Sequence, residues 1–150
     1  MTVAVALLDV NVLLALAWPN HLHHDAAHEW FAAQRAGGWA SCTLTQSAFV
    51  RLSCQPSVVK TVITIQDAMQ ILEANLAAAE HVFWPLEHPI PELTGEIRCR
   101  VTGHRQLADA LLLDLAIRRQ GRLATFDGRI EGLLPTDSTH RSALEVLPIT

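Results

Sequence analysis

Three aspartates in this sequence, Asp9, Asp109 and Asp127, are far apart along the chain but occupy comparable points of its apolar pattern. Asp9 follows six consecutive apolar residues, and Asp127 closes a second strand-like segment over residues 122–127. Asp109 lies early in a helical pattern that precedes this second strand. Because open α/β sheets bind ligands where their strands end, the three carboxylates are candidates for one shared site.

The chemistry of such a cluster points to a divalent cation. Carboxylates about 5 Å apart repel by roughly 3 kcal/mol per pair at an effective dielectric of 20, so gathering them does not stabilise a fold. Oxygen ligands with room for water suit Mg²⁺ or Mn²⁺. A cation held in this way activates water for attack on a phosphodiester.

Asp9 taken alone has a second interpretation. Asp and Asn are favoured at helix N-caps, where they contribute about 1 kcal/mol, and a helical pattern begins directly after Asp9. The two interpretations are separated by whether the other carboxylates reach the same edge of the sheet.

The apolar pattern predicts an α/β layout with right-handed crossovers. Unalternating apolar runs indicate strands covered on both faces, as in parallel sheets. The expected strands are residues 3–8, 39–43, 82–86 and 122–127, with an edge strand at 144–148. The expected helices begin at 12 and cover 25–36, 44–52, 66–79, 91–101 and 104–120, with a loop at 54–57 and no clear assignment for 58–65.

The predicted helix over residues 104–120 determines where Asp109 lies. This helix must run antiparallel to the strand that follows it in order to pack on the sheet. Its N-terminal half therefore lies near the carboxyl ends of the strands, beside Asp9 and Asp127.

Composition indicates one domain over residues 1–150 with a sizeable core, since 50% of the residues are hydrophobic and 17% are charged. Three widely spaced cysteines favour a reducing, cytoplasmic setting over a disulfide framework. No signal peptide or membrane span is expected. The net charge of −4 argues against nucleic-acid binding through the overall field but leaves room for a local basic patch.

Residues 8–14, 108–112 and 123–127 together resemble the PIN-domain nucleases, in particular the VapC-type toxins of bacterial type II toxin-antitoxin pairs. The similarity extends over essentially the whole chain. It implies a three-layer α/β/α domain with a central, mainly parallel sheet of four to five strands. It also implies a Mg²⁺- or Mn²⁺-dependent endoribonuclease that acts on RNA, is inhibited by a cognate antitoxin and forms a homodimer.

The resemblance also implies roles for individual residues. Asp9, Asp109 and Asp127 would be the catalytic, metal-binding acids. Asn11 would orient Asp9, and the hydroxyl of Thr125 would support the site without touching the metal.

One position departs from the family pattern. The family generally carries a glutamate three residues before the position of Arg51, and this chain has Ala48 there. Thr45 or Gln46 could offer a neutral oxygen to metal-bound water instead, whereas Asp114, about 140° round the helix from Asp109, points elsewhere unless the groove is wide. The departure leaves open a PIN-like RNA- or partner-binding module with impaired catalysis.

Two further groups of residues have competing interpretations. Four histidines, two of them spaced like a zinc pair, fit either a zinc site or a polar segment beside the groove: His21, His23, His24 and His28. Three arginines fit either RNA-phosphate contacts or a solvated face: Arg98, Arg100 and Arg105. Trp18 and Trp30 are candidates for a dimer or antitoxin surface.

Overall fold

The computed structural model describes residues 3–149, and its centre is a five-stranded sheet with the order β3-β2-β1-β4-β5. All four neighbouring pairs are parallel. The strands are β1 (Ala6–Leu8), β2 (Trp39–Ser41), β3 (His81–Phe83), β4 (Arg122–Thr125) and β5 (Leu144–Val146). Because every strand runs the same way, all their carboxyl ends lie at one edge, with β1 in the middle.

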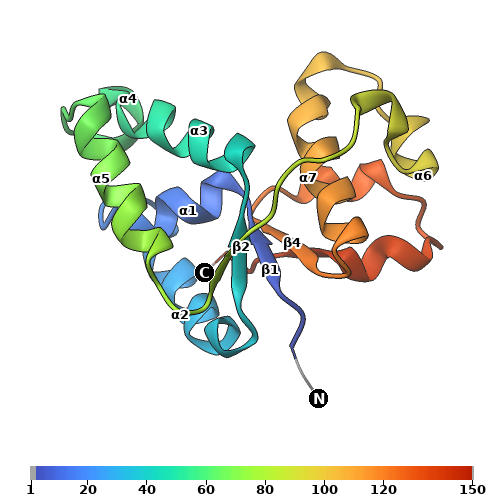
Figure 1. The fold of residues 1–150 in the computed structure, drawn as a ribbon, viewed down its shortest axis with the longest axis horizontal. Helices are drawn as coiled ribbons and strands as arrows, with labels where there is room; N and C mark the ends of the chain where they lie inside the picture. Colours follow the sequence, from blue (N-terminus) through green and yellow to red (C-terminus); the bar gives the residue numbers. More distant parts are fainter. Residues whose placement is uncertain (1–2, 150) are drawn as a thin grey trace.

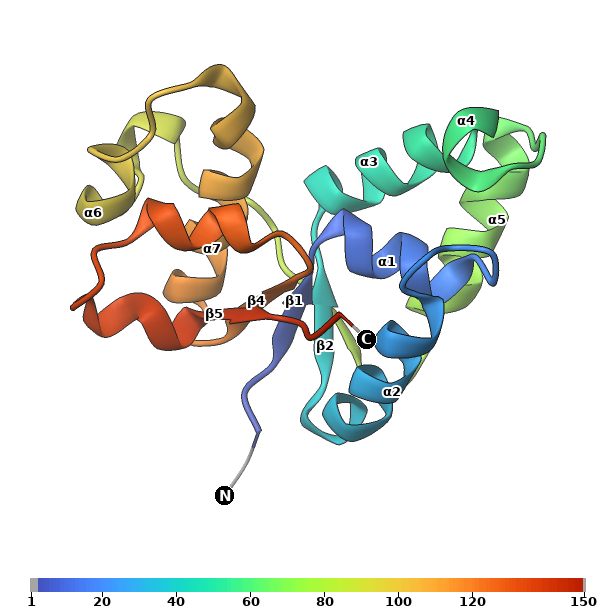
Figure 2. The same cartoon turned by 180° about the vertical axis from the view of Figure 1, so that it is seen from behind.

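Helices cover both faces of this sheet (Figure 1). One face carries α1 (Val10–Ala17), α2 (His24–Gln34), α3 (Thr43–Ser53), α4 (Pro56–Val59) and α5 (Ile65–Leu76). The other carries α6 (Gly95–Arg98), α7 (Leu107–Arg118) and the 3-10 segments Gly128–Leu133 and Thr139–Ala143, as the reverse view also shows (Figure 2). The predicted three-layer α/β/α architecture is confirmed.

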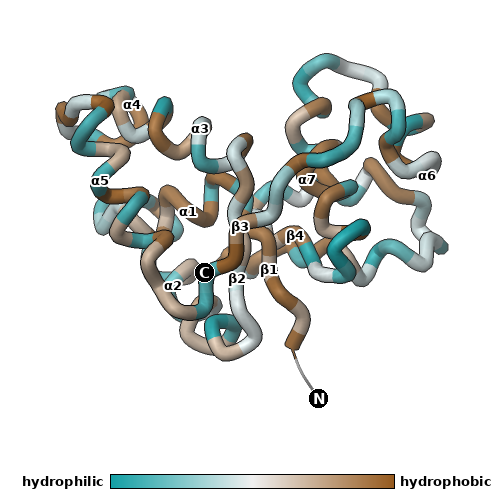
Figure 3. The backbone as a smooth tube through the Cα atoms, viewed as in Figure 1, coloured by the Kyte–Doolittle hydropathy of each residue, from teal (hydrophilic) through white to brown (hydrophobic). Residues whose placement is uncertain are grey.

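Alternate residues along the strands pack into two separate hydrophobic cores, one on each face of the sheet. Leu7 packs with α7 residues such as Leu113, while Leu8, its neighbour in β1, packs with α1 and with Phe49 of α3. The tube through β1 is accordingly hydrophobic throughout (Figure 3). A strand buried on both faces needs this unalternating composition, which is why the apolar run before Asp9 predicted a parallel sheet.

The segment over residues 91–101 is not the helix that the sequence pattern predicted. The structure has a 3-10 turn (Ile90–Glu92) and then the single turn of α6. Between them the backbone N–H of Thr94 donates to Oδ1 of Asp114 at 2.8 Å instead of to a helical carbonyl. A tertiary hydrogen bond therefore interrupts the segment, and local spacing could not reveal it.

The other predicted helix and loop boundaries lie closer to those of the structure. The predicted loop at 54–57 contains the start of α4, where Pro56 occupies the first turn and Lys60, in the left-handed region with φ 62°, ends the helix. The predicted helix over 104–120 begins as a 3-10 turn (His104–Gln106) and continues as α7. Within residues 3–149, none of the helices is both long enough and apolar enough to cross a membrane.

Candidate active site

Asp9 stands at the junction of β1 and α1, at the carboxyl edge of the sheet. Its backbone N–H donates to the carbonyl of Ala124 in β4, and its Oδ1 accepts from the N–H of Val10 at 2.7 Å. Asp9 is thus the N-cap of α1, as its second interpretation held. The cap uses one carboxylate oxygen, so capping and a role in the shared site are compatible.

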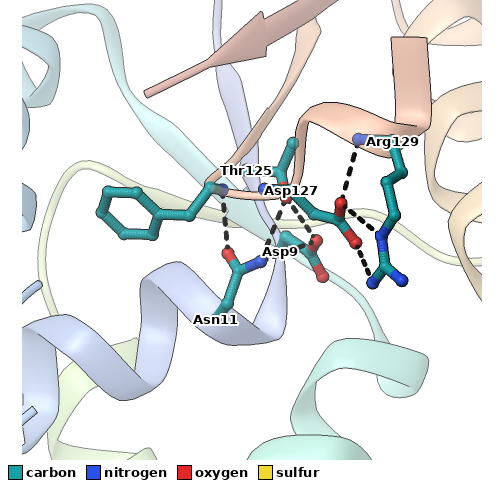
Figure 4. A network of polar contacts seen from close by, with 6 residues as sticks. Asp9, Asn11, Thr125, Asp127 and Arg129 are labelled. Carbon is teal, nitrogen blue, oxygen red and sulfur yellow. Dashed lines mark hydrogen bonds and ion pairs between the residues drawn. The ribbon is translucent and has the colours of Figure 1, made fainter. Parts of the chain in front are cut away.

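Thr125 joins the end of β4 to this carboxylate (Figure 4). Its hydroxyl donates to Oδ2 of Asp9 at 2.7 Å and accepts from Nδ2 of Asn11 at 3.1 Å and from the N–H of Asp127 at 3.0 Å. Asn11 completes the link, because its Oδ1 accepts from the N–H of Phe126 at 3.2 Å. The orientation of Asp9 is therefore fixed from the end of β4 and from the first turn of α1.

Asp109 lies in the first turn of α7, where the antiparallel packing argument placed it. Partial burial, reinforced by the charges of Asp9 and Asp127, raises the pKa of its carboxyl from 3.8 to about 6. Burial also raises the pKa of Asp9, partly offset by the hydrogen bonds from Thr125 and Val10, while Asp127 adds to the rise. The three aspartates therefore share one electrostatic site.

Asp127 is held differently from the other two. Arg129 grips it with two hydrogen bonds, Nε to Oδ1 at 3.0 Å and Nη2 to Oδ2 at 2.8 Å, and these hold the pKa of Asp127 below its usual range. Across residues 3–149, no three His, Cys, Asp or Glu side chains are arranged so that they could hold a metal ion. The carboxylates are close enough to shift one another's pKa, yet they are not assembled around one point.

A cavity of about 280 Å³ opens beside Asp109. Its lining combines two arginines with polar and apolar groups: Arg105, Gln106, Asp109, Arg129, Ile130 and Leu133. Sequence reasoning missed Gln106 and Arg129, although Arg129 follows a strand-ending aspartate by two residues, a signal that could have been used. Arg98, which donates to the carbonyl of Pro91, and the exposed Arg100 do not line this cavity.

The residues considered as substitutes at the Ala48 position have other partners. The buried hydroxyl of Thr45 donates to the carbonyl of Cys42 and accepts from the N–H of the same residue, so it is held at the start of α3. Asp114 accepts from Thr94 and Arg118, which removes it from the site. Gln46 donates through Nε2 to Ser41 at the end of β2, leaving its carbonyl oxygen for another partner.

The histidine segment packs on the C-terminal end of α1. Nδ1 of His24 lies 2.7 Å from the carbonyl of Ala15, and Nε2 of His28 lies 2.8 Å from that of Leu16. These contacts satisfy helix-end carbonyls and give the pair a structural explanation without zinc. His23 instead stacks on Phe126, with ring centroids 4.9 Å apart, and so borders the site.

The two tryptophans proposed for a dimer or antitoxin surface both make contacts within the chain. Nε1 of Trp18 donates to Ser53 at 3.2 Å, and Nε1 of Trp30 donates to Glu145 at 2.9 Å.

The sequence pattern of the PIN domain matches residues 6–133, which include all three aspartates. The chain belongs to the PIN-domain family. Within this family it is 42% identical to the ribonuclease VapC39 of Mycobacterium tuberculosis over 142 residues, covering 95% of this chain and 99% of the relative. It is 44% identical to the ribonuclease VapC38 of the same organism, covering 84% and 87% respectively.

Solved structures show the same PIN fold at low sequence identity. VapBC2 from Rickettsia felis, crystallised with a promoter DNA fragment, aligns with a TM-score of 0.60 at 16% identity, covering 94% of this chain and 97% of the other. FitAcB from Neisseria gonorrhoeae aligns with a TM-score of 0.56 at 18% identity, covering 85% and 92%. The fold is therefore preserved where most of the sequence has changed.

Proposed function

We propose that this PIN-domain chain is the toxin of a toxin-antitoxin pair and acts as an endoribonuclease that hydrolyses RNA phosphodiester bonds. The observation that carries the proposal is the gathering of Asp9, Asp109 and Asp127 at the carboxyl edge of the sheet, from three segments far apart in the sequence. The high identity to curated VapC ribonucleases over nearly the whole chain supports it.

The proposed cofactor is Mg²⁺ or Mn²⁺, held by these three aspartates. The chemistry of the donors fits such an ion, because they are all oxygen atoms and because the charges of Asp9 and Asp109 lack a bonded cationic partner among the described side chains. Since the three carboxylates are not arranged around one point in residues 3–149, a bound ion would have to draw them together. When bound, the ion would supply Lewis-acid polarisation and activate water. At Asp127 the ion would compete with the guanidinium of Arg129 for the carboxylate.

The protein's own residues perform the remaining tasks. Thr125 and Asn11 keep Asp9 in one orientation, which preserves the geometry of a ligand without adding charge. Asp109 would release a proton on accepting a cation, because its raised pKa, about 6, leaves it partly protonated in mildly acidic solution. Arg105, at the cavity beside Asp109, is positioned to hold an RNA phosphate.

The proposed partners are RNA as substrate, a cognate antitoxin and a second copy of this chain. The similarity of the fold to those of VapBC2 and FitAcB supports an antitoxin partner. Arg98 and Arg100 remain candidates for RNA contacts outside the cavity, and the oxygen of Gln46 remains a candidate for contact with metal-bound water.

The test is cleavage of total cellular RNA by the purified, antitoxin-free chain with EDTA, Mg²⁺ or Mn²⁺. The Asp9→Asn variant should lose the metal-dependent cleavage, and Asp137→Asn, the same change at an exposed position, should retain it. If all three folded proteins leave the RNA intact with either metal, the RNA- or partner-binding module with impaired catalysis becomes the better assignment.

A further inference from the structure

The ion pair between Asp127 and Arg129 lies beside Asp9 and the residues that hydrogen-bond to it (Figure 4). Arg129 forms both side-chain bonds to the carboxylate, and its backbone N–H adds a third contact to Oδ1 at 3.0 Å. Each oxygen that Asp127 could offer to a cation therefore already accepts a hydrogen bond from the guanidinium.

The ion pair between Asp127 and Arg129 has good hydrogen-bond geometry but contributes little stabilisation. The side chain of Arg129 is 91% exposed, and exposed ion pairs contribute little because water screens them and a long side chain must be ordered. A divalent cation shared with Asp9 and Asp109 can displace such a partner, whereas a buried arginine would resist. Since the guanidinium bonds come only from the side chain, their removal leaves the backbone contact that shapes the turn.

Arg129 borders a cavity in its present, ion-paired position. It lines the cavity of about 280 Å³ together with Arg105 and Asp109. A guanidinium released there faces a space whose other cation is Arg105, and two arginines on one cavity form a binding site for a phosphate.

We infer that Arg129 is an internal competitor of the metal ion: it holds Asp127 in the free protein and, when the cation takes that carboxylate, turns to an RNA phosphate in the cavity. This inference rests on the proposed metal-dependent cleavage of RNA. It makes Arg129 a positioning residue for Asp127 and an RNA contact, coupling metal binding to substrate binding.

The test measures Mn²⁺ binding to the purified, EDTA-treated chain from the electron paramagnetic resonance signal of free Mn²⁺. Arg129→Ala should bind Mn²⁺ about two- to fivefold more tightly than the wild type, the factor expected for loss of an exposed ion pair. Arg129→Lys, which retains charge but not the paired geometry, should fall between them. Arg105→Ala is the matched control, because it removes the same charge from the same cavity without freeing Asp127.

A second measurement follows RNA cleavage at saturating Mn²⁺. Arg129→Ala should raise KM with little change in kcat, and the dependence of log KM on log salt concentration should fall by about one phosphate contact. The same variant should reach half-maximal rate at a lower Mn²⁺ concentration. Tighter metal binding with weaker RNA binding is the combination that a merely structural residue would not produce.

Each outcome is decisive. Equal Mn²⁺ affinity in Arg129→Ala and the wild type, or an equal gain in Arg105→Ala, would overturn the inference while leaving the proposed nuclease intact. An unchanged KM would overturn the transfer of Arg129 to RNA. Failure of every protein, including the wild type, to bind Mn²⁺ would overturn the metal-dependent function, and the inference with it.

Discussion

Two aspartates are buried to the same extent, 5% exposed each, but the protein treats their charges in opposite ways. Asp114 on α7 accepts from Nε of Arg118 at 2.7 Å and from the N–H and hydroxyl of Thr94 at 2.8 and 2.6 Å. Asp9 accepts only from neutral groups, chiefly Val10 and Thr125, and has two further aspartates for neighbours. One buried charge is compensated, and the other is not.

The difference separates structural from functional carboxylates. A buried ion pair with additional hydrogen bonds satisfies its own charge, as at Asp114. Neutral donors around Asp9 fix its direction but leave its negative charge available to a cation. A buried carboxylate whose pKa is raised by burial, in a cleft with other acids, is a functional candidate on physical grounds.

The sharpest test of the contrast is Asp9→Asn. We expect RNA cleavage to fall by about a thousandfold or more, since a lost metal ligand removes several kcal/mol of transition-state stabilisation. The free energy of unfolding in EDTA should stay the same or rise, because an uncompensated charge has been removed. Cleavage assays and urea unfolding measure the two effects, and retained cleavage would remove Asp9 from the site.

The complementary change is Asp114→Asn. It should lower the free energy of unfolding by about 2–3 kcal/mol, because Arg118 and Thr94 lose an ionised partner and Arg118 is only partly able to regain water. Cleavage per folded molecule should match the wild type. The comparison fails if urea unfolding shows normal stability while cleavage is lost.

A smaller effect on metal binding is expected from Thr125, an uncharged residue that hydrogen-bonds to Asp9. Thr125→Val should weaken Mn²⁺ binding by about tenfold, because it removes the donor to Oδ2 of Asp9 and the acceptor used by Asn11. Thr125→Ser keeps the hydroxyl and should stay near the wild type. Equal losses in both variants would point to packing of the threonine methyl group instead.

The smallest expected effect is a change of the free energy of unfolding with pH. Partial burial raises the pKa of Asp109 from 3.8 to about 6, so between these values the unfolded chain has released a proton that the folded chain keeps. Stability in EDTA should therefore fall as pH rises from about 4 to about 6 and then level off. Asp109→Asn should lose this component, so that melting temperature relative to the wild type rises over the same range. A constant difference would contradict the raised pKa.

The sequence placed the three aspartates at one edge of the sheet mainly through the direction in which the strands and the helix before β4 run. The apolar run before Asp9 predicted a doubly covered parallel strand, and the helix preceding β4 had to present Asp109 at the same edge. Both inferences depend on connectivity and on packing a helix against a sheet, so they needed no contact information.

The failures have a different physical origin. The predicted helix over 91–101 is broken because Thr94 gives its N–H to Asp114, twenty residues away. The sequence also did not reveal that the hydroxyl of Thr45, a candidate oxygen beside the metal, bonds to the backbone of Cys42 at the start of α3. Periodicity reports which face of an element is apolar, but it does not report which polar partner a side chain selects.

The sequence by itself determined the parallel α/β sheet and the placing of three aspartates near its carboxyl edge, because apolar patterning and chain direction can be read from the order of the residues. Only the tertiary structure decided that Thr125 and Asn11 fasten Asp9, that Asp114 is neutralised by Arg118, and that Arg129 occupies Asp127. These are choices between competing hydrogen-bond and charge partners, and they are made only when segments distant in sequence come into contact.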